Sequence, residues 1–263
     1  MISISSGQLD AWLALFFWPF LRIVALMLSE PMLGNSAIPR RARAGIAVIL
    51  TLAIAPLLPA PPPVSFVSAQ GVMIAAQQLL IGFVLGFSMR LVLNSIEMAG
   101  HIAGLSMGLG FATFFDPQNS MQSPVLAQFL GVLAMLVFFA MNGHLIVISA
   151  LYESFHVLPV SAAPLSANGF RALAEAGGQI FLVGFMLSLP MIAAILIANI
   201  ALGVLTRAAP QLNLFAVGFP LTISAGFAVL LMALPYLLPS IMRLFEEGAL
   251  HALKLIGLMR AAG

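Results

Sequence analysis

The sequence changes character over residues 100–117, which read GHIAGLSMGLGFATFFDP. Glycine recurs there at every fourth position, as Gly100, Gly104 and Gly108. On a helix this spacing puts the three glycines on one face, where a second backbone can approach closely. Gly-xxx-Gly alone is common in membrane helices, but two consecutive steps before an aromatic break are more specific. We therefore predict a helix-packing ridge.

Bulky apolar side chains accompany and follow this ridge: Met107, Phe111, Phe114 and Phe115. Two interpretations are open for this cluster. Most such clusters are hydrophobic loops buried against neighbouring helices. Alternatively, bulky apolar side chains at a constriction seal a pore by excluding water and ions, and a flexible methionine suits a seal that must conform to a moving object. The segment ends at Asp116-Pro117, which has the chemistry of a turn.

The composition around this stretch sets the class of protein. Apolar residues make up 62% of the chain and charged residues only 7%, where a soluble domain has about a quarter charged. No Asp, Glu, Lys or Arg occurs in four long runs, 44–89, 117–152, 176–206 and 208–242. Since about 20 apolar residues cross the hydrocarbon core, the chain is predicted to be an all-α, polytopic membrane protein. The apolar runs are continuous, which excludes an alternating β-barrel pattern.

Six hydrophobic segments can be delimited along the chain. They lie near 11–33, 44–60, 71–93, 125–151, 180–205 and 214–238. The second is marginal in length and ends in a proline cluster, which predicts a rigid extended connector. Prolines inside the later segments, Pro190, Pro220 and Pro235, are each expected to kink or break a helix.

The last twenty residues are amphipathic. Arg243, Glu247, His251 and Lys254 share one helical face, and apolar residues occupy most of the rest. This pattern predicts a helix that runs on from the last span. It fits a membrane surface and a partner protein equally well.

Orientation in the membrane is weakly signalled. The one basic cluster, Pro39–Arg43, is expected on the cytoplasmic side. If six spans alternate strictly, both termini lie outside, which the basic C-terminus opposes. The spans then leave five Lys/Arg on one side and four on the other, which is no real bias. Either the number of spans differs from six or some segments do not cross a bilayer in the ordinary sense.

A polar stripe precedes the glycine ridge if the third segment is a continuous helix from about 71 to 109. At 100° per residue, four polar side chains fall on the line of Gly104 and Gly108. They are Arg90, Asn94, Glu97 and His101. One interpretation is a face packed against helices or a pore, because ionisable groups avoid lipid. The other is that the helix simply emerges into the cytoplasm, with an exposed i, i+4 pair. The glycines on the same line favour packing.

Catalytic and ligand-binding motifs are missing from the sequence. It has no His-Glu-x-x-His, no Gly-x-Ser-x-Gly and no P-loop, and its four histidines lack metal-ligand spacing. With no cysteine, thiolate chemistry is absent. The net charge of +2 is too small to indicate nucleic acid as a partner. We expect neither an enzyme nor a bound cofactor or metal.

Several stretches closely resemble the FliR family of the bacterial flagellar export gate. They are residues 100–117, then Asn142-Gly143-His144 and Glu153-Ser154-Phe155, together with Leu9-Asp10-Ala11-Trp12 and 34–39 nearer the N-terminus. The resemblance covers essentially the whole chain. Its specific part is Phe111–Pro117, because the apolar spans would fit many membrane proteins.

This resemblance implies an architecture and a set of partners. Residues 1–175 would form a FliP-like part that carries the glycine ridge and a plug loop, and 176–263 a FliQ-like helical hairpin. Several FliP and FliQ subunits would join one such chain in the entrance of the export channel, with FlhB and FlhA nearby. The location would be the flagellar basal body in the bacterial inner membrane, in contact with lipid.

The resemblance also implies a mechanism. Phe111 and Phe114 match the family's plug-loop aromatics, with Phe115 beside them, so they would help to seal the closed channel. An unfolded flagellar export substrate would displace this plug, with energy supplied elsewhere in the apparatus.

Three rival interpretations are open, and one of them belongs to another functional class. The homologous subunit of a virulence type III secretion system would share the fold and the mechanism but carry other cargo. A small-molecule transporter would fit the proline-interrupted segments, but such proteins place ionisable groups mid-membrane and here Arg22 is the only strong charge deep in a span. A structural scaffold would use the aromatic cluster as core alone.

Overall fold

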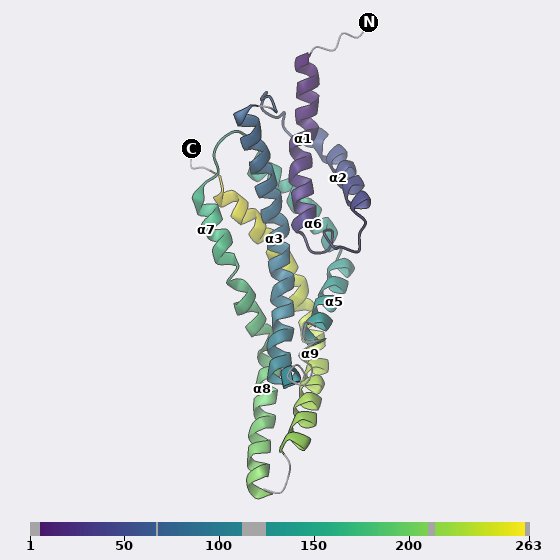
Figure 1. The fold of residues 1–263 in the computed structure, drawn as a ribbon, viewed down its shortest axis with the longest axis vertical. Coiled ribbons are helices and arrows are strands. Elements are labelled where there is room, and N and C mark those ends of the chain that lie inside the picture. Colours follow the sequence, from purple (N-terminus) through teal and green to yellow (C-terminus); the bar gives the residue numbers. More distant parts are fainter. Residues whose placement is uncertain (1–5, 67, 112–124, 210–213, 261–263) are drawn as a thin grey trace. The chain divides into compact units, whose positions relative to one another are not determined.

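The computed structural model describes residues 6–66, 68–111, 125–209 and 214–260. These residues form helices and connecting turns, with no strand among them (Figure 1). In chain order the helices are α1 (Ser6–Ser29), α2 (Arg40–Ile54), α3 (Ala69–Ser106), α5 (Val125–Ala140), α6 (Gly143–Val157), α7 (Ala167–Ala176), α8 (Gln179–Ala208) and α9 (Leu214–Leu258). Short 3-10 turns, η1 (Ala55–Leu57) and η2 (Leu109–Phe111), follow α2 and α3. The predicted all-α class is therefore confirmed.

The six hydrophobic segments are not confirmed as six membrane spans. Four stretches of the described chain are long and apolar enough to cross a membrane, namely Trp12–Ser29, Ala69–Ser106, Ala167–Ala208 and Gly218–Leu258. A fifth exists only if α5 and α6 count together as one broken span. The segment 44–60 falls short because α2 has 15 residues, a length of about 22 Å against a hydrocarbon core of about 30 Å.

The segment 125–151 divides because its helix breaks at Met141 and Asn142. Asn142 adopts φ 57° in the left-handed region, which asparagine tolerates better than most residues. The Asn142 backbone carbonyl accepts a hydrogen bond from the amide of Leu145 at 2.8 Å, so the next helix begins there. The Asn-Gly step thus ends one helix and starts another.

The prolines do not interrupt the later helices. α8 continues through Pro190, and α9 through Pro220, Pro235 and Pro239. The expected breaks are therefore absent, although a local kink at each proline stays a prediction. Membrane helices tolerate proline because neighbouring groups and small local adjustments satisfy the freed carbonyl.

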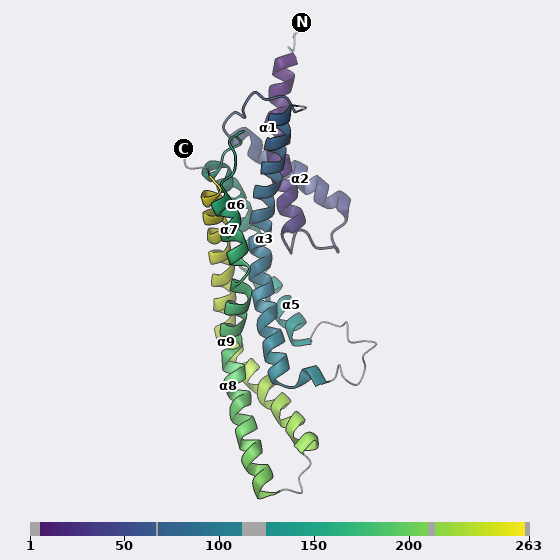
Figure 2. The ribbon, with the colours of Figure 1, turned by 60° about the vertical axis from the view of Figure 1, so that its left-hand side comes forward.

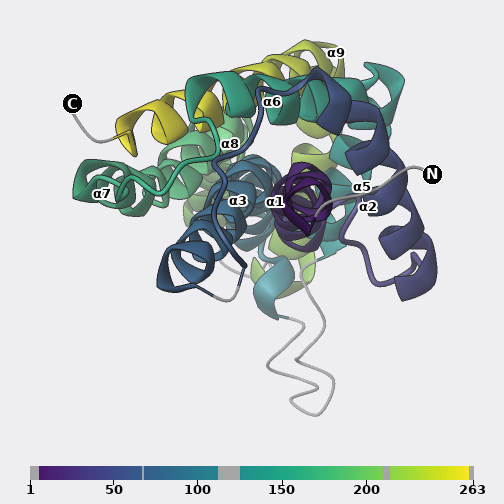
Figure 3. The same ribbon diagram turned by 90° about the horizontal axis from the view of Figure 1, so that it is seen from above.

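Contacts divide the chain into two compact units, each made of separate segments. The first unit combines residues 1–91, 142–177 and 245–263, and the second combines 92–141 and 178–244. In the first unit α1 lies between α2 and the N-terminal part of α3 (Figures 1 and 3). The predicted boundary at 175/176 follows family resemblance rather than contacts, and it stays a prediction.

The amphipathic C-terminal segment continues α9 without a break, as predicted. It packs into the first unit of its own chain. Ala249 and Ala252 line a small cavity with Leu26 and Leu85, and the Met259 carbonyl accepts a hydrogen bond from the amide of Ser166 at 2.8 Å. Its charged residues point to the exposed side. The sequence alone did not decide whether a membrane surface or a partner protein covers the apolar face of this segment. In the structure, other residues of the same chain cover it.

Candidate functional site: the end of α3 and its surroundings

Gly100 is the tightest contact of the predicted glycine ridge. A Cβ placed on Gly100 would lie 2.5 Å from the Cα of Ala127 in α5. At Gly104 the nearest atoms would be 3.8 Å away, which is ordinary van der Waals contact. The backbones of α3 and α5 therefore approach closely at Gly100, whereas Gly104 has room for a methyl group.

Gly108 lies outside the helix and does not extend the ridge, which corrects the prediction at this position. α3 ends at Ser106, and Gly108 has φ 83°. Its amide donates to the Leu105 carbonyl at 3.0 Å. Helices commonly end on a glycine in the left-handed conformation because it has no Cβ to clash. Gly108 thus turns the chain away from α3.

Met107 anchors the end of α3 against α9. Its side chain is fully buried, and its Cγ would lie 2.5 Å from a Cβ placed on Gly226. Its backbone carbonyl accepts a hydrogen bond from Oγ1 of Thr222 at 3.2 Å. The missing side chain of Gly226 therefore makes the space that Met107 fills. Met107 lies in packed core, as the burial interpretation expects for that residue.

The aromatic part of the cluster begins where this anchor ends. The backbone of Phe111 closes the 3-10 turn η2. Its side chain, and the residues Phe114, Phe115, Asp116 and Pro117, lie outside the described residues. The two interpretations of these aromatics therefore both stay open.

The polar stripe on α3 has one exposed and one partly buried end. Arg90 is exposed, and Asn94, Glu97 and His101 are partly buried. A Cβ at Gly131 of α5 would lie 2.7 Å from Oε1 of Glu97, so this glycine makes room for the carboxylate. The stripe therefore packs in part against α5. Sequence inspection missed Gly131, since nothing in α5 alone marks it as the partner of a charged residue.

A large cavity of mixed polar and apolar lining opens beside Met107. Its volume is about 460 Å³, and it lies between the end of α3, α8 and α9. Glycines and small polar residues make up much of its wall. They are Ser106, Gly108, Asn199, Gly203, Thr206, Gly218 and Thr222. Small and polar residues of this kind let membrane helices approach and hydrogen-bond one another.

A second polar feature is Arg22 in α1, whose guanidinium is fully buried. Its Nε donates to Oε1 of Gln78 at 2.9 Å, and its two terminal nitrogens donate to Oγ of Ser154 at 3.1 Å and to the Leu158 carbonyl at 2.9 Å. The guanidinium carbon also lies 4.0 Å from the centroid of the Phe155 ring. Arg22 thereby joins α1, α3 and α6 through neutral partners.

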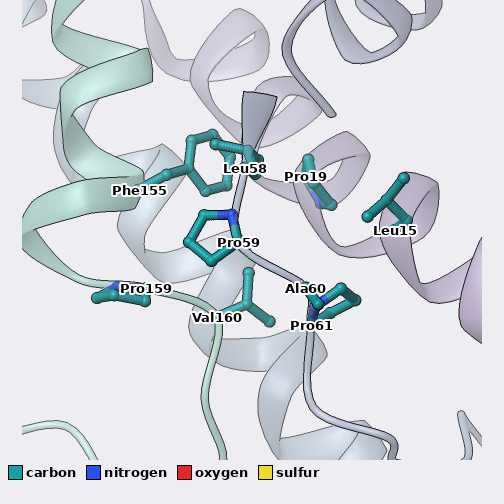
Figure 4. A pocket seen from close by; sticks show the side chains of 9 residues that line it. All are labelled: Leu15, Pro19, Leu58, Pro59, Ala60, Pro61, Phe155, Pro159 and Val160. Atoms are coloured by element: carbon teal, nitrogen blue, oxygen red, sulfur yellow. The ribbon is translucent and has the colours of Figure 1, made fainter. Parts of the chain in front are cut away.

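Proline residues surround a small cavity near this network. Its volume is about 40 Å³, and Pro19, Pro59, Pro61 and Pro159 contribute to its wall (Figure 4). A space of this size holds about one water molecule. Its place between α1, the proline connector and the end of α6 indicates a packing role.

Glu30 forms a third buried polar site, directly after α1. Its Oε2 accepts hydrogen bonds from the amides of Met32, at 2.9 Å, and of Leu33. Its Oε1 is buried without a hydrogen-bond partner among the described residues. Burial raises the pKa of Glu30 to about 7, although the two amides and the charge of Arg90 act in the opposite direction.

Among the described residues, no three metal-ligating side chains gather in one place.

The end of α3 combines three features, namely the buried anchor Met107, the turn at Gly108 and the apolar turn η2. This arrangement fixes where the aromatic segment starts.

The comparison with known proteins decides the family. Residues 13–248 match the sequence model described as bacterial export proteins, family 1. The chain belongs to this family. It is 45% identical over 94% of its length to the flagellar biosynthetic protein FliR of Escherichia coli, and the match also covers 94% of that protein. Identity is 46% to FliR of Pectobacterium carotovorum, over the same shares, and 28% to FliR of Bacillus subtilis, over 92% of this chain and 95% of that protein. Family membership confirms the resemblance seen in the sequence.

Proposed function

We propose that this chain is a subunit of the flagellar protein export gate in the bacterial inner membrane. The observation that carries the proposal is the 45–46% identity, along nearly the whole chain, to proteins named as flagellar biosynthetic FliR. The four apolar spans fit a membrane-embedded component of such an apparatus. The role is export, not catalysis.

The partners follow from the same family relation. The chain would join FliP and FliQ subunits at the channel entrance, with FlhB and FlhA nearby, and pass unfolded flagellar proteins. Residues 1–175 would act as the FliP-like part and 176–263 as the FliQ-like hairpin. The low burial of the hairpin supports this, since most of its apolar surface is left for lipid or for neighbouring subunits.

The proposed seal rests on the aromatics that follow η2. Met107 and Gly108 would hold the start of this segment in place, because one is locked against Gly226 and the other sets the turn. Phe111, Phe114 and Phe115 would then close the channel by excluding water. An export substrate would displace them without any chemical step in this chain.

The test of the seal is the ion conductance of the assembled gate. Phe111→Ala combined with Phe114→Ala is expected to raise the leak, because two large apolar side chains are removed from the constriction. Phe129→Ala is the matched control, since it removes a half-exposed ring from α5. An unchanged conductance in the double variant would leave the cluster with a packing role only.

The test of the export role is complementation. The gene for this chain, expressed in a bacterium that lacks its own FliR, is expected to restore flagellar export and swimming. A host that assembles the chain into its gate but secretes no flagellar protein would overturn the assignment.

A further inference from the structure

Helix α2 presents an apolar face that the described chain leaves uncovered. Its buried positions form one narrow stripe, Ala47, Thr51 and Ile54. The opposite side carries Val48, Ile49 and Leu52, of which Ile49 is 67% exposed. Figure 2 shows α2 on the outside of α1 and inclined to it. An uncovered helix face in water is normally polar, so this face requires an apolar environment.

Positive charge gathers at the N-terminal end of the same helix. Arg40 and Arg41 are exposed, whereas Arg43 donates to the Gly34 carbonyl at 3.3 Å and so fastens the preceding turn. Glu30 is the nearest acidic residue before these arginines and Glu97 the nearest after them, with none between the two. The one ion pair among the described residues, Arg171–Glu175, is elsewhere. Arg40 and Arg41 therefore carry charge that the described chain does not neutralise.

We propose that α2 lies in the membrane interface, with its outer face against acyl chains and with Arg40 and Arg41 on anionic phospholipid head groups. The exposed apolar face and the two exposed arginines together favour lipid over a protein partner. An apolar protein partner would cover Val48, Ile49 and Leu52 but would not require two unpaired cations at one end of the helix. Arginine near a membrane surface is attracted to anionic lipid and keeps its charge in the head-group region.

The geometry of α2 fits an interfacial position and not a span. The helix is about 22 Å long. Its C-terminal end continues into η1 and the proline-rich connector 58–66, whose residues are exposed or partly exposed. Irregular backbone does not face lipid within the hydrocarbon core. An oblique α2 keeps both the arginines and the connector near the head groups. The inference concerns lipid alone and is independent of the proposed export role.

The surroundings of α2 can be measured directly because the chain has no cysteine. Ile49→Cys gives one site for a spin label, whose collision rates with oxygen and with a water-soluble nickel chelate are compared in phosphatidylglycerol nanodiscs. Ala47→Cys, which is 1% exposed, supplies the protein-buried reference. Arg171→Cys on α7 supplies the aqueous reference.

High oxygen and low nickel accessibility at position 49 is the expected result. Low accessibility to both reagents, as at position 47, would show a protein-covered face and overturn the proposal. High nickel accessibility would overturn it in favour of water. The measurement uses the purified export complex, or the chain alone where it is recovered alone.

The head-group part of the proposal needs a second measurement. A fluorophore at position 49 is quenched by brominated phosphatidylglycerol or by brominated phosphatidylcholine, and the ratio gives the local preference for the anionic lipid. Each arginine is expected to contribute about fivefold to this preference, so Arg40→Gln with Arg41→Gln should largely abolish it. Arg171→Gln is the charge-matched control and should leave the ratio unchanged. A preference that survives the double substitution would refute head-group binding.

Discussion

Helix α3 and the hairpin of α8 and α9 are both strongly apolar, yet they are packed very differently. Within an apolar run of 18 residues in Ala69–Ser106, 61% of positions are buried, against 22% in the corresponding run of Ala167–Ala208 and 22% in that of Gly218–Leu258. Individual glycines show the two extremes of packing. A Cβ on Gly82 or Gly100 of α3 would collide with the backbone of α1 or α5, whereas one on Gly203 of α8 would meet nothing within 4 Å.

The difference teaches that apolarity alone does not tell what covers a membrane helix. Close backbone approach and buried polar contacts mark the faces that the chain covers itself. Both features are concentrated along α1 and α3, at Arg22, Gly82 and Gly100. The hairpin has such contacts on its inner face, at Thr222 and Gly226, but none at the exposed Gly203. Its outer faces therefore await lipid or other subunits.

The largest effect is expected at Arg22. Arg22→Met removes three hydrogen bonds and leaves the Gln78 and Leu158 oxygens without their donor, which costs about 3 kcal/mol. Thermal unfolding of the purified protein measures this loss. Arg22→Lys should rescue little, because one ammonium group cannot reproduce the fork of the guanidinium. A fully stable Arg22→Met protein would contradict the view that polar contacts hold the densely packed region together.

A second large effect should depend on pH through Glu30. Its pKa is about 7 in the folded chain and about 4.5 when unfolded, so the folded state binds the proton more tightly. The contribution to stability is full below pH 4.5 and is lost as pH rises through 7, a change of about 3 kcal/mol. Unfolding curves at pH 5 and pH 8 measure it. Glu30→Gln should remove this dependence, and its persistence in that variant would assign it to other groups.

A smaller and sharper test compares two glycines on one helix. Gly100→Ala should destabilise the contact between α3 and α5 by about 2 kcal/mol through overpacking. Gly104→Ala is the matched control and should be neutral or slightly stabilising, because its methyl group meets only ordinary contacts and alanine favours helix. Equal effects at the two positions would show that the difference in packing does not matter.

The smallest effect on the chain itself is expected at Gly203. Gly203→Leu should change its stability by less than about 0.5 kcal/mol, the usual range for an exposed site. If a neighbouring subunit covers α8, the same substitution should abolish recovery of the assembled complex. Parallel measurement of melting temperature and complex yield separates the two. Loss of both together would mean that the chain already fills this space.

The sequence was sufficient for the class of protein and for the family, but not for the number of spans. Uncharged runs identify membrane helices, whereas the αL conformation at Asn142 and the early end of α2 depend on local backbone preferences that hydropathy does not measure. The continuity of α9 into its charged end was predictable from periodicity.

Within the candidate site, spacing was a partial guide. It placed Gly100 on a contact face but also placed Gly108 there, because a four-residue repeat gives no sign of where the helix ends. Glu97 was predicted to lie on a polar helical face, but its contact with Gly131 was not predicted. A glycine leaves space for a neighbour, and only the structure shows which side chain fills that space. The burial of Met107 likewise depends on Gly226, which lies more than a hundred residues away.

The most direct test of the central claim is to tag this chain, extract it in mild detergent and identify what purifies with it by mass spectrometry. The expected result is one large particle that contains FliP and FliQ, in which the exposed hairpin is covered. A monodisperse chain, free of these subunits and stable alone, would contradict the assignment to the export gate.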